Sequence, residues 1–135
     1  MFADMGLLTA QETGELEQAS ESWVARLLAT GEYIGWLAEC DGKIVAGAGA
    51  LMREQGPAPG FPRVGKWVHI VNVYTERPYR RQGFARELMT TILDWCQANA
   101  IMHVTLGASA DGRALYESLG FRQTSDMKLA GSARI

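Results

Sequence analysis

The chain has 135 residues, a formal net charge of −2 and an apolar share of 47%. That length suits one domain with a single hydrophobic core, and so small a net charge argues against a nucleic acid or an anionic membrane as a partner. The charges are nevertheless uneven, because acidic residues concentrate in the first third of the chain and arginines gather between residues 77 and 86. A local basic cluster in a nearly neutral protein favours a small anionic ligand.

The cysteines and histidines show no metal-site or disulfide framework. Cys40, Cys96, His69 and His103 are isolated from one another and lack metal-ligand spacing. The chain also has no apolar run of the roughly 20 residues that a membrane span needs, and its start lacks the form of a signal peptide. We therefore expect a cytoplasmic protein with reduced thiols and no metal ion.

The first third of the chain predicts a helix followed by a hairpin. Thr9-Ala10-Gln11-Glu12 has the form of a capping box, and apolar residues then recur at three- and four-residue spacing until Gly31 ends the helix. Two strands follow, Tyr33–Cys40 and Lys43–Arg53. The dipeptide Asp41-Gly42 joins them as a tight turn, because glycine accepts positive φ without cost.

The middle of the chain predicts a loop, a central strand and a helix. Gln55–Gly65 contains three prolines and three glycines, so it does not hold regular structure. Lys66–Thr75 is a β-rich run that is apolar enough for a central strand. Phe84–Asn99 is an amphipathic helix, and Ile101–Leu106 is a further strand.

The last part of the chain predicts a short helix and two weak strands. The helix covers Asp111–Leu119 and ends at Gly120, and the strands cover Phe121–Thr124 and Met127–Ala130. The whole order of elements indicates an α/β fold with one mixed sheet and helices packed on it.

The junction before the helix at Phe84 is the most informative segment. A helix start presents unpaired backbone N–H groups and the positive end of the helix dipole, and both favour a bound phosphate. Gly83 removes a side chain where ligand oxygens would approach the backbone, and Ala85 keeps the next turn small. Three arginines of the segment add positive charge: Arg80, Arg81 and Arg86. Taken alone, the pattern also fits a structural loop with solvated arginines.

Two segments together resemble a known family. Residues 72–85, NVYTERPYRRQGFA, resemble the acetyl-coenzyme A-binding motif of the GCN5-related N-acetyltransferases, Arg/Gln-x-x-Gly-x-Gly/Ala. Residues 106–121, LGASADGRALYESLGF, are similar to the second motif of that family. The motifs stand in the family's order, with one helix and one strand between them, and the resemblance runs from about Tyr33 to the C-terminus.

The resemblance implies the architecture of the protein. We expect a single domain over residues 1–135 with a mixed, mostly antiparallel central sheet, a splayed pair of parallel strands, and helices on both faces. Only Met1–Leu8 precede the first predicted helix, so the family's first strand and helix are expected to be missing. Either the domain is N-terminally shortened, or Met1 lies inside a longer protein. That loss would leave Tyr33–Cys40 at a sheet edge, which favours a homodimer.

The resemblance also implies acetyl-coenzyme A as the co-substrate. The backbone of Val73, Tyr74 and Thr75 would pair with the pantetheine arm, which lies like an extra strand between the splayed strands. Ser109 stands near the position of an asparagine that contacts the cofactor in many relatives. The pyrophosphate would be held by the basic loop and helix start: Arg80, Arg81, Gln82, Gly83, Phe84, Ala85 and Arg86.

Candidate catalytic residues follow from the same resemblance. Tyr116 matches the family's tyrosine, whose hydroxyl protonates the leaving thiolate, although its ring also fits a purely structural place in the core. Glu76 and His69 are candidates for the general base, but Glu76 equally fits an arginine partner and His69 a satisfied strand histidine. Because the family often relays the proton through ordered water, Asn72 is a candidate for polarising that water or contacting the substrate.

The sequence therefore predicts an N-acetyltransferase that transfers an acetyl group from acetyl-coenzyme A to a primary amine of a small molecule or peptide. Direct attack within a ternary complex is the expected mechanism. The alternative is a non-catalytic acyl-coenzyme A-binding or sensing domain. A different nucleotide-binding module is less well supported, because neither a Walker lysine nor the remaining glycines of a dinucleotide fingerprint accompany Gly83.

Overall fold

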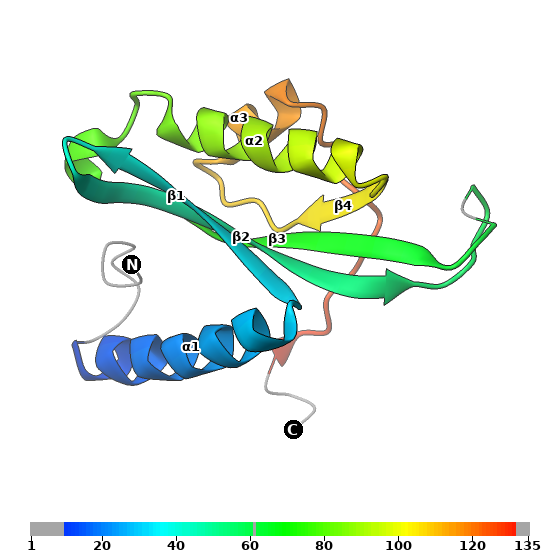
Figure 1. Ribbon diagram of the computed structural model, residues 1–135, viewed down its shortest axis with the longest axis horizontal. Helices are drawn as coiled ribbons and strands as arrows, with labels where there is room; N and C mark the ends of the chain where they lie inside the picture. Colours follow the sequence, from blue (N-terminus) through cyan, green and yellow to red (C-terminus); the bar gives the residue numbers. More distant parts are fainter. Residues whose placement is uncertain (1–9, 61, 132–135) are drawn as a thin grey trace.

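The computed structural model describes residues 10–60 and 62–131, and its centre is one four-stranded sheet in the order β1-β2-β3-β4 (Figure 1). The first three strands are antiparallel neighbours, and β4 runs parallel to β3. The strands are β1 Tyr33–Cys40, β2 Lys43–Gln55, β3 Gly65–Thr75 and β4 His103–Leu106. This mixed, mostly antiparallel sheet confirms the predicted α/β class.

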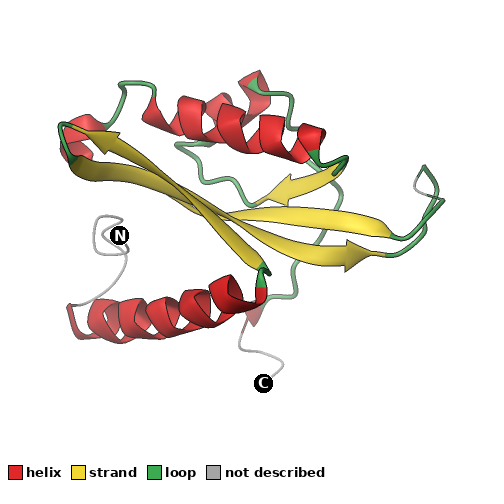
Figure 2. Cartoon of the chain, viewed as in Figure 1, coloured by secondary structure: helices red, strands yellow, loops and turns green. Residues whose placement is uncertain are grey.

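Helices lie on both faces of the sheet, as predicted (Figure 2). Helix α1, Ala10–Thr30, lies on one face, whereas α2, Phe84–Ala98, and α3, Arg113–Ser118, lie on the other (Figure 1). No helix within the described residues is long and apolar enough to cross a bilayer. The capping box at Thr9 and the short stretch before it lie outside the described residues.

The hydrophobic core lies between α2 and the sheet. Met89, Ile92 and Cys96 of α2 are buried against small and β-branched residues of β2 and β3. The small side chains of Ala48 and Ala50 on β2 let the helix approach the sheet closely. Burial of Met89 and Ile92 contributes roughly 1.5–3 kcal/mol each to stability relative to leaving them exposed. The amphipathic helix predicted from its apolar stripe is therefore confirmed.

The two weak strands predicted near the C-terminus are absent from the structure. Residues 122–130 are exposed and have no strand partner in the described part of the chain, and Met127 is 97% exposed. The prediction was wrong because Met127 and Leu129 alternate as strand residues do, but neither faces a core. Alternation without a buried face does not stabilise a strand.

A β-bulge separates the end of β3 from the regular sheet. Val71 of β3 lies opposite Gly49 of β2, but Tyr74 lies opposite Gly47, so one residue of β2 faces two of β3. Asn72, within the bulge, has φ of +56°, a left-handed conformation that asparagine tolerates better than most residues. Pairing between β3 and β4 stops at Ile70, whereas β3 continues beyond the bulge. The predicted splay of the parallel strands is thus produced at this point.

The bulge is held from the neighbouring strands. The Asn72 side-chain amide donates a hydrogen bond to the Tyr33 hydroxyl over 3.2 Å. The Tyr33 ring crosses β2 at Gly49, where any Cβ would overlap its hydroxyl. Glycine at this position therefore makes room for the contact between β1 and the bulge, and Tyr33 is itself buried, with the Trp23 ring of α1 at 6.3 Å.

Replacing Gly49 with alanine should destabilise the protein by about 1–3 kcal/mol, because the added methyl group forces the Tyr33 ring out of its place. Gly35→Ala is the matched control, since Gly35 is the cross-strand partner of Gly49 and a Cβ there meets only a Tyr33 ring carbon at 3.6 Å. Urea denaturation measures both. Equal losses of unfolding free energy in the two variants would contradict this role of Gly49.

Candidate active site

The loop between β3 and α2 is fixed by its own side chains. A 3-10 turn, Arg77–Tyr79, follows β3, and the Arg80 Nε atom donates to the Thr75 carbonyl over 2.8 Å. The Gln82 amide donates to the Pro78 carbonyl over 3.1 Å. These two predicted cofactor-binding side chains therefore hold the loop against the end of the strand, and the Arg80 backbone N–H donates to the Arg77 carbonyl over 3.2 Å.

The amides at the start of α2 are unpaired. Among residues 10–60 and 62–131, no hydrogen bond is donated by the backbone N–H groups of residues 81–86. Gly83, with φ of +88°, precedes the helix, and an added Cβ would meet nothing within 4 Å. Alternating helical and left-handed backbone turns successive N–H groups toward one point, which makes an anion-binding concavity. The helix dipole adds to that preference for negative charge.

The remaining side chains of this segment have different positions. Arg81 is exposed at the loop, with φ of +62°. Arg86, predicted as a cofactor contact, donates instead to the Ser118 hydroxyl over 3.0 Å and so joins α2 to α3. Phe84 packs its ring against Tyr79 at 6.3 Å, and Ala85 is half-buried. The Phe84 side chain therefore stabilises the loop through its contact with Tyr79.

The end of β3 offers an open strand edge next to this loop. Val73, Tyr74 and Thr75 are half-buried and lie beyond the last pair with β4, Ile70 with Leu106. On their other side they remain joined to β2, with Tyr74 opposite Gly47. An amide-bearing arm of a ligand can pair with such an edge as an added strand does. The structure thus brings the predicted strand residues and the predicted loop together.

A cavity of about 800 Å³ lies where β3, β4, α3 and the chain after α3 meet. Tyr116 lines it, although its ring also belongs to the hydrophobic core and packs edge-to-face on Phe121 at 6.1 Å. Burial raises the pKa of the Tyr116 phenol. A Cβ at Gly112 would lie 2.9 Å from this ring, so the glycine before α3 gives the tyrosine its space.

Ser109, a predicted cofactor contact, closes the turn before α3. Its hydroxyl accepts a hydrogen bond from the Gly112 amide over 3.1 Å, and its carbonyl accepts one from the Arg113 amide over 3.1 Å. The side chain is exposed. Ser109 lies near Tyr116 because only a short turn separates Ser109 from α3.

Three further side chains that line the cavity, Trp67, His69 and Thr105, contact one another. The Trp67 indole N–H donates to the Thr105 hydroxyl over 2.8 Å, and the His69 Nδ1 atom lies 2.7 Å from that same oxygen. Burial lowers the pKa of His69, and the positive charge of Arg53 lowers it further by a smaller amount. The sequence indicated His69 as a candidate but gave no signal for Thr105, whose position depends on the pairing of β3 with β4.

The other candidate bases lie elsewhere. Neither Glu76 nor Asn72 is among the residues that line the cavity containing Tyr116. The amide nitrogen of Asn72 is used by the Tyr33 hydroxyl. Glu76 follows β3 and its backbone N–H donates to the Val45 carbonyl over 2.8 Å. The two residues therefore do not line the cavity that contains Tyr116.

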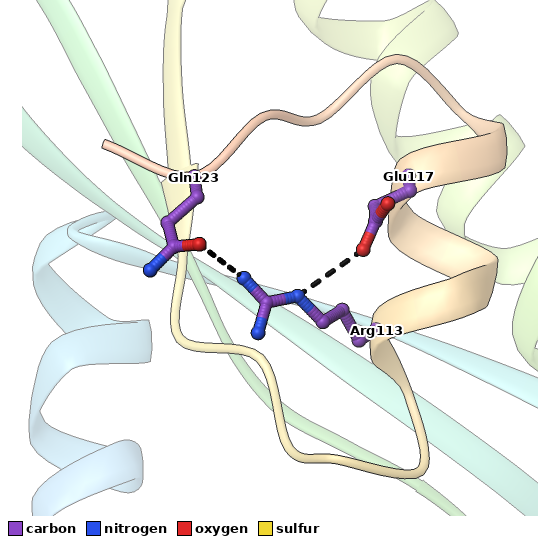
Figure 3. Close-up of polar contacts among 3 residues, drawn as sticks. All are labelled: Arg113, Glu117 and Gln123. Atoms are coloured by element: carbon purple, nitrogen blue, oxygen red, sulfur yellow. Dashed lines mark hydrogen bonds and ion pairs between the residues drawn. The ribbon is translucent and has the colours of Figure 1, made fainter.

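Arg113 links α3 to the chain that follows it, through contacts with two other residues that line the cavity (Figure 3). Arg113 contacts the Glu117 carboxylate over 3.1 Å and donates to the Gln123 carbonyl oxygen over 2.6 Å. Because the ion pair is largely exposed, it contributes at most about 1 kcal/mol to stability. The hydrogen bond to Gln123 is the contact that connects α3 to the segment after it.

A sheet that splays beside a helix start with unpaired amides is the arrangement expected for a protein that binds an acyl-coenzyme A thioester. The chain belongs to the acetyltransferase (GNAT) family, whose sequence profile matches residues 5–121. The resemblance seen in the two motifs is thereby confirmed.

Two curated human relatives are similar over most of this chain. N-acetyltransferase 8 is 28% identical over 103 residues, and N-acetyltransferase 8B is 29% identical over 92 residues. These matches cover 74% and 66% of this chain but only 43% and 38% of the relatives. The chain therefore spans less than half the length of the curated proteins that it matches.

Solved structures share the fold. A GCN5-related N-acetyltransferase from Ralstonia eutropha is 27% identical with a TM-score of 0.82, covering 94% of this chain and 83% of that one. A predicted acetyltransferase from Clostridium acetobutylicum, crystallised with acetyl-coenzyme A, is 24% identical with a TM-score of 0.80. That match covers 94% of this chain and 80% of the other. The predicted N-acetyltransferase fold is thereby confirmed.

The raised pKa of Tyr116 predicts a loss of stability in alkaline solution. The phenol ionises less readily in the folded protein than in the unfolded chain, where tyrosine has a pKa of about 10. Its contribution is therefore complete below that pH and is lost as the pH rises through the higher folded-state value. The free energy of unfolding, measured by urea denaturation between about pH 8 and 11, should fall more steeply for the wild-type protein than for Tyr116→Phe. If the unfolding free energy of the two proteins fell equally with pH, the raised pKa of Tyr116 would be contradicted.

Proposed function

We propose that the protein is an N-acetyltransferase that moves the acetyl group of acetyl-coenzyme A to a primary amine of a small molecule or peptide. The observation that carries the proposal is the row of unpaired amides at residues 81–86, next to the open edge of β3. Residues 1–135 would act as one domain, and the family membership of the chain supports this activity.

In this proposal the co-substrate is held mainly by backbone groups. The amides of residues 81–86 bind the pyrophosphate, and Gly83 leaves the approach to them open. Arg81 adds a positive charge at the rim. The backbone of Val73, Tyr74 and Thr75 pairs with the pantetheine arm. Binding through main-chain groups orients the thioester without relying on long side chains, whose ordering costs conformational entropy.

The chemistry needs an acid on the thiolate side. The nitrogen of the neutral amine attacks the thioester carbon, the carbon–nitrogen bond forms and the carbon–sulfur bond breaks; the nitrogen loses one proton to solvent, and the sulfur takes one. Tyr116 suits this role because a phenol carries its proton in neutral solution, and burial, which raises its pKa, does not change that. Its place on the cavity wall supports the same assignment. Ser109, in the turn before α3, remains a proposed contact to the co-substrate.

The acceptor is proposed to enter the cavity from the side lined by the strand residues. Glu117 and Asp126 give that cavity acidic groups, and Arg113 and Arg122 give it basic ones. An amine that carries further polar groups fits such a mixed wall better than a purely apolar amine does. Cytoplasmic location and a homodimer formed through the edge strand β1 remain predictions.

Thiol release from acetyl-coenzyme A distinguishes an enzyme from a sensing domain. With a panel of primary amines, the wild-type protein should release coenzyme A, and Tyr116→Phe should reduce the rate by about 100-fold or more, because general acid catalysis is lost. Calorimetry should find the coenzyme A affinity of that variant unchanged. Tyr79→Phe, which removes a hydroxyl outside the cavity, is the matched control. A protein that binds coenzyme A but releases no thiol with any amine would instead be the sensing domain.

A further inference from the structure

We propose that Trp67 selects the acceptor, which is a primary amine that carries a neutral aromatic or apolar group close to its nitrogen. The proposal rests on the proposed function and deepens it, because it names the class of amine that the cavity takes. The indole ring of Trp67, which lines the cavity, is the surface on which that group stacks. A second positive charge in the same place is disfavoured.

Trp67 differs from two other tryptophans of the chain in what it packs against. Trp36 and Trp95 pack on the hydrophobic core and contact each other, with ring centroids 5.5 Å apart. Trp67 is not among the residues that pack on the buried core in the described part of the chain. It is instead half-buried and lines the cavity. A large aromatic ring that the core does not use and that borders a cavity is available to a ligand.

The alternation of side chains along β3 puts Trp67 on the face of the sheet away from α2. Val68 is buried in the core, so Trp67 and His69, its neighbours along the strand, face the other way. His103 of β4 pairs with Trp67, and the centroids of their rings are 5.5 Å apart. The His69 ring lies 6.3 Å from the Trp67 ring. These three rings, here called the aromatic patch, all line the cavity.

The indole of Trp67 is held in one orientation. Its N–H donates to the Thr105 hydroxyl over 2.8 Å. The His69 Nδ1 atom lies 2.7 Å from the same oxygen, so the hydroxyl is itself fixed from two sides. Because an indole nitrogen only donates, this bond uses its whole hydrogen-bonding capacity, and the ring offers a ligand apolar surface. A ring that is already ordered does not lose rotamer entropy when a ligand stacks on it.

The same hydrogen bond places the ring close to the splay. Thr105 pairs with His69, two residues beyond Trp67 along β3, so the indole leans toward the open end of the strand. The last β3–β4 pair, Ile70 with Leu106, is one residue further. One or two residues of a strand span about 3–7 Å. An acceptor whose nitrogen reaches the splay therefore carries the stacked group within a few atoms of that nitrogen.

The charges around the aromatic patch disfavour a cation there. An indole face by itself attracts cations as well as apolar groups. Arg53 of β2, however, pairs with Trp67 across the sheet. Burial lowers the pKa of His69 and the positive charge of Arg53 lowers it further, so this charge acts on the patch. The carboxylates that line the cavity, Glu117 and Asp126, come from α3 and the chain after it. A neutral group is therefore the better partner for Trp67.

Amino acid amides test this preference, because they share one α-amino group and one carboxamide and differ only in the side chain. With the wild-type protein, thiol release should give a kcat/KM at least about tenfold higher for phenylalanine amide than for alanine amide, because only the former stacks on Trp67. Arginine amide should not exceed alanine amide, because its guanidinium meets the charge of Arg53. Phenethylamine and a peptide that begins with phenylalanine, compared in the same assay, distinguish a small-molecule source of the ring from a peptide source.

Substitution of Trp67 should remove the preference without removing the activity. Trp67→Ala should lower kcat/KM for phenylalanine amide about tenfold and leave that for alanine amide nearly unchanged, so that their ratio falls to about one. Trp67→Phe keeps a ring and should retain most of the ratio. Trp23→Ala is the matched control, because it removes an indole that does not line this cavity, and the ratio should stay as in the wild-type protein. Calorimetry should find the coenzyme A affinity of Trp67→Ala unchanged.

Two further positions keep the proposal testable if Trp67→Ala does not fold. Thr105→Val removes the partner of the indole N–H and should lower the phenylalanine-to-alanine ratio about threefold, whereas Thr105→Ser should preserve it. Arg53→Glu reverses the charge beside Trp67. It should raise the arginine-to-alanine ratio about threefold, and added salt should weaken this effect because Arg53 is exposed.

The possible results separate this inference from the proposed function. Equal kcat/KM for phenylalanine amide and alanine amide, or a ratio that survives Trp67→Ala, would overturn the role of Trp67 while leaving an active acetyltransferase. So would thiol release with other amines but with neither phenylalanine amide nor phenethylamine. A protein that releases no thiol with any amine would overturn the proposed function, and this inference with it.

Discussion

The divergence of β3 from β4 after Ile70 is the constraint on which the rest of the structure depends. It follows from a bulge at Asn72 that is tied to Tyr33, and Tyr33 reaches the bulge only because residue 49 is a glycine. A continuous parallel pair would satisfy both strand edges and leave no place for an extended ligand. The two strands instead stay paired over four residues and then open beside the start of α2.

The helix start complements this opening, because it places unpaired N–H groups at the end of the strand that has lost its neighbour. Arg80 and Gln82 use their side chains to fix the loop, and Arg86 binds α3, so the backbone is the surface left for an anion. Tyr116 of α3 lines a cavity that β3 and β4 also border. In the proposed reaction, the groups that bind the co-substrate are therefore separate from the group that gives a proton to the leaving thiolate.

The order of elements was predictable because local signals define it: Asp41-Gly42 makes the hairpin turn, and the apolar stripe of α2 has clear helical spacing. The loop that we propose binds an anion was also apparent in the sequence, since Gly83 and the arginines around it form a contiguous motif. The meeting of His69, Thr105 and Trp67 was not, because it depends on the register between strands far apart in sequence. Nor did any local pattern indicate the bulge at Asn72, and the alternation of Met127 and Leu129 misled because no core lies beneath them.

Backbone amide chemical shifts test the central claim most directly, because each N–H group reports its own contact. In a ¹⁵N-labelled sample titrated with coenzyme A, the amides of residues 81–86 should shift strongly as the pyrophosphate binds, together with those of Val73–Thr75 as the pantetheine arm pairs with β3. Inorganic phosphate should change the chemical shifts of the residue 81–86 amides alone. Saturating coenzyme A that leaves residues 81–86 unshifted would contradict the account.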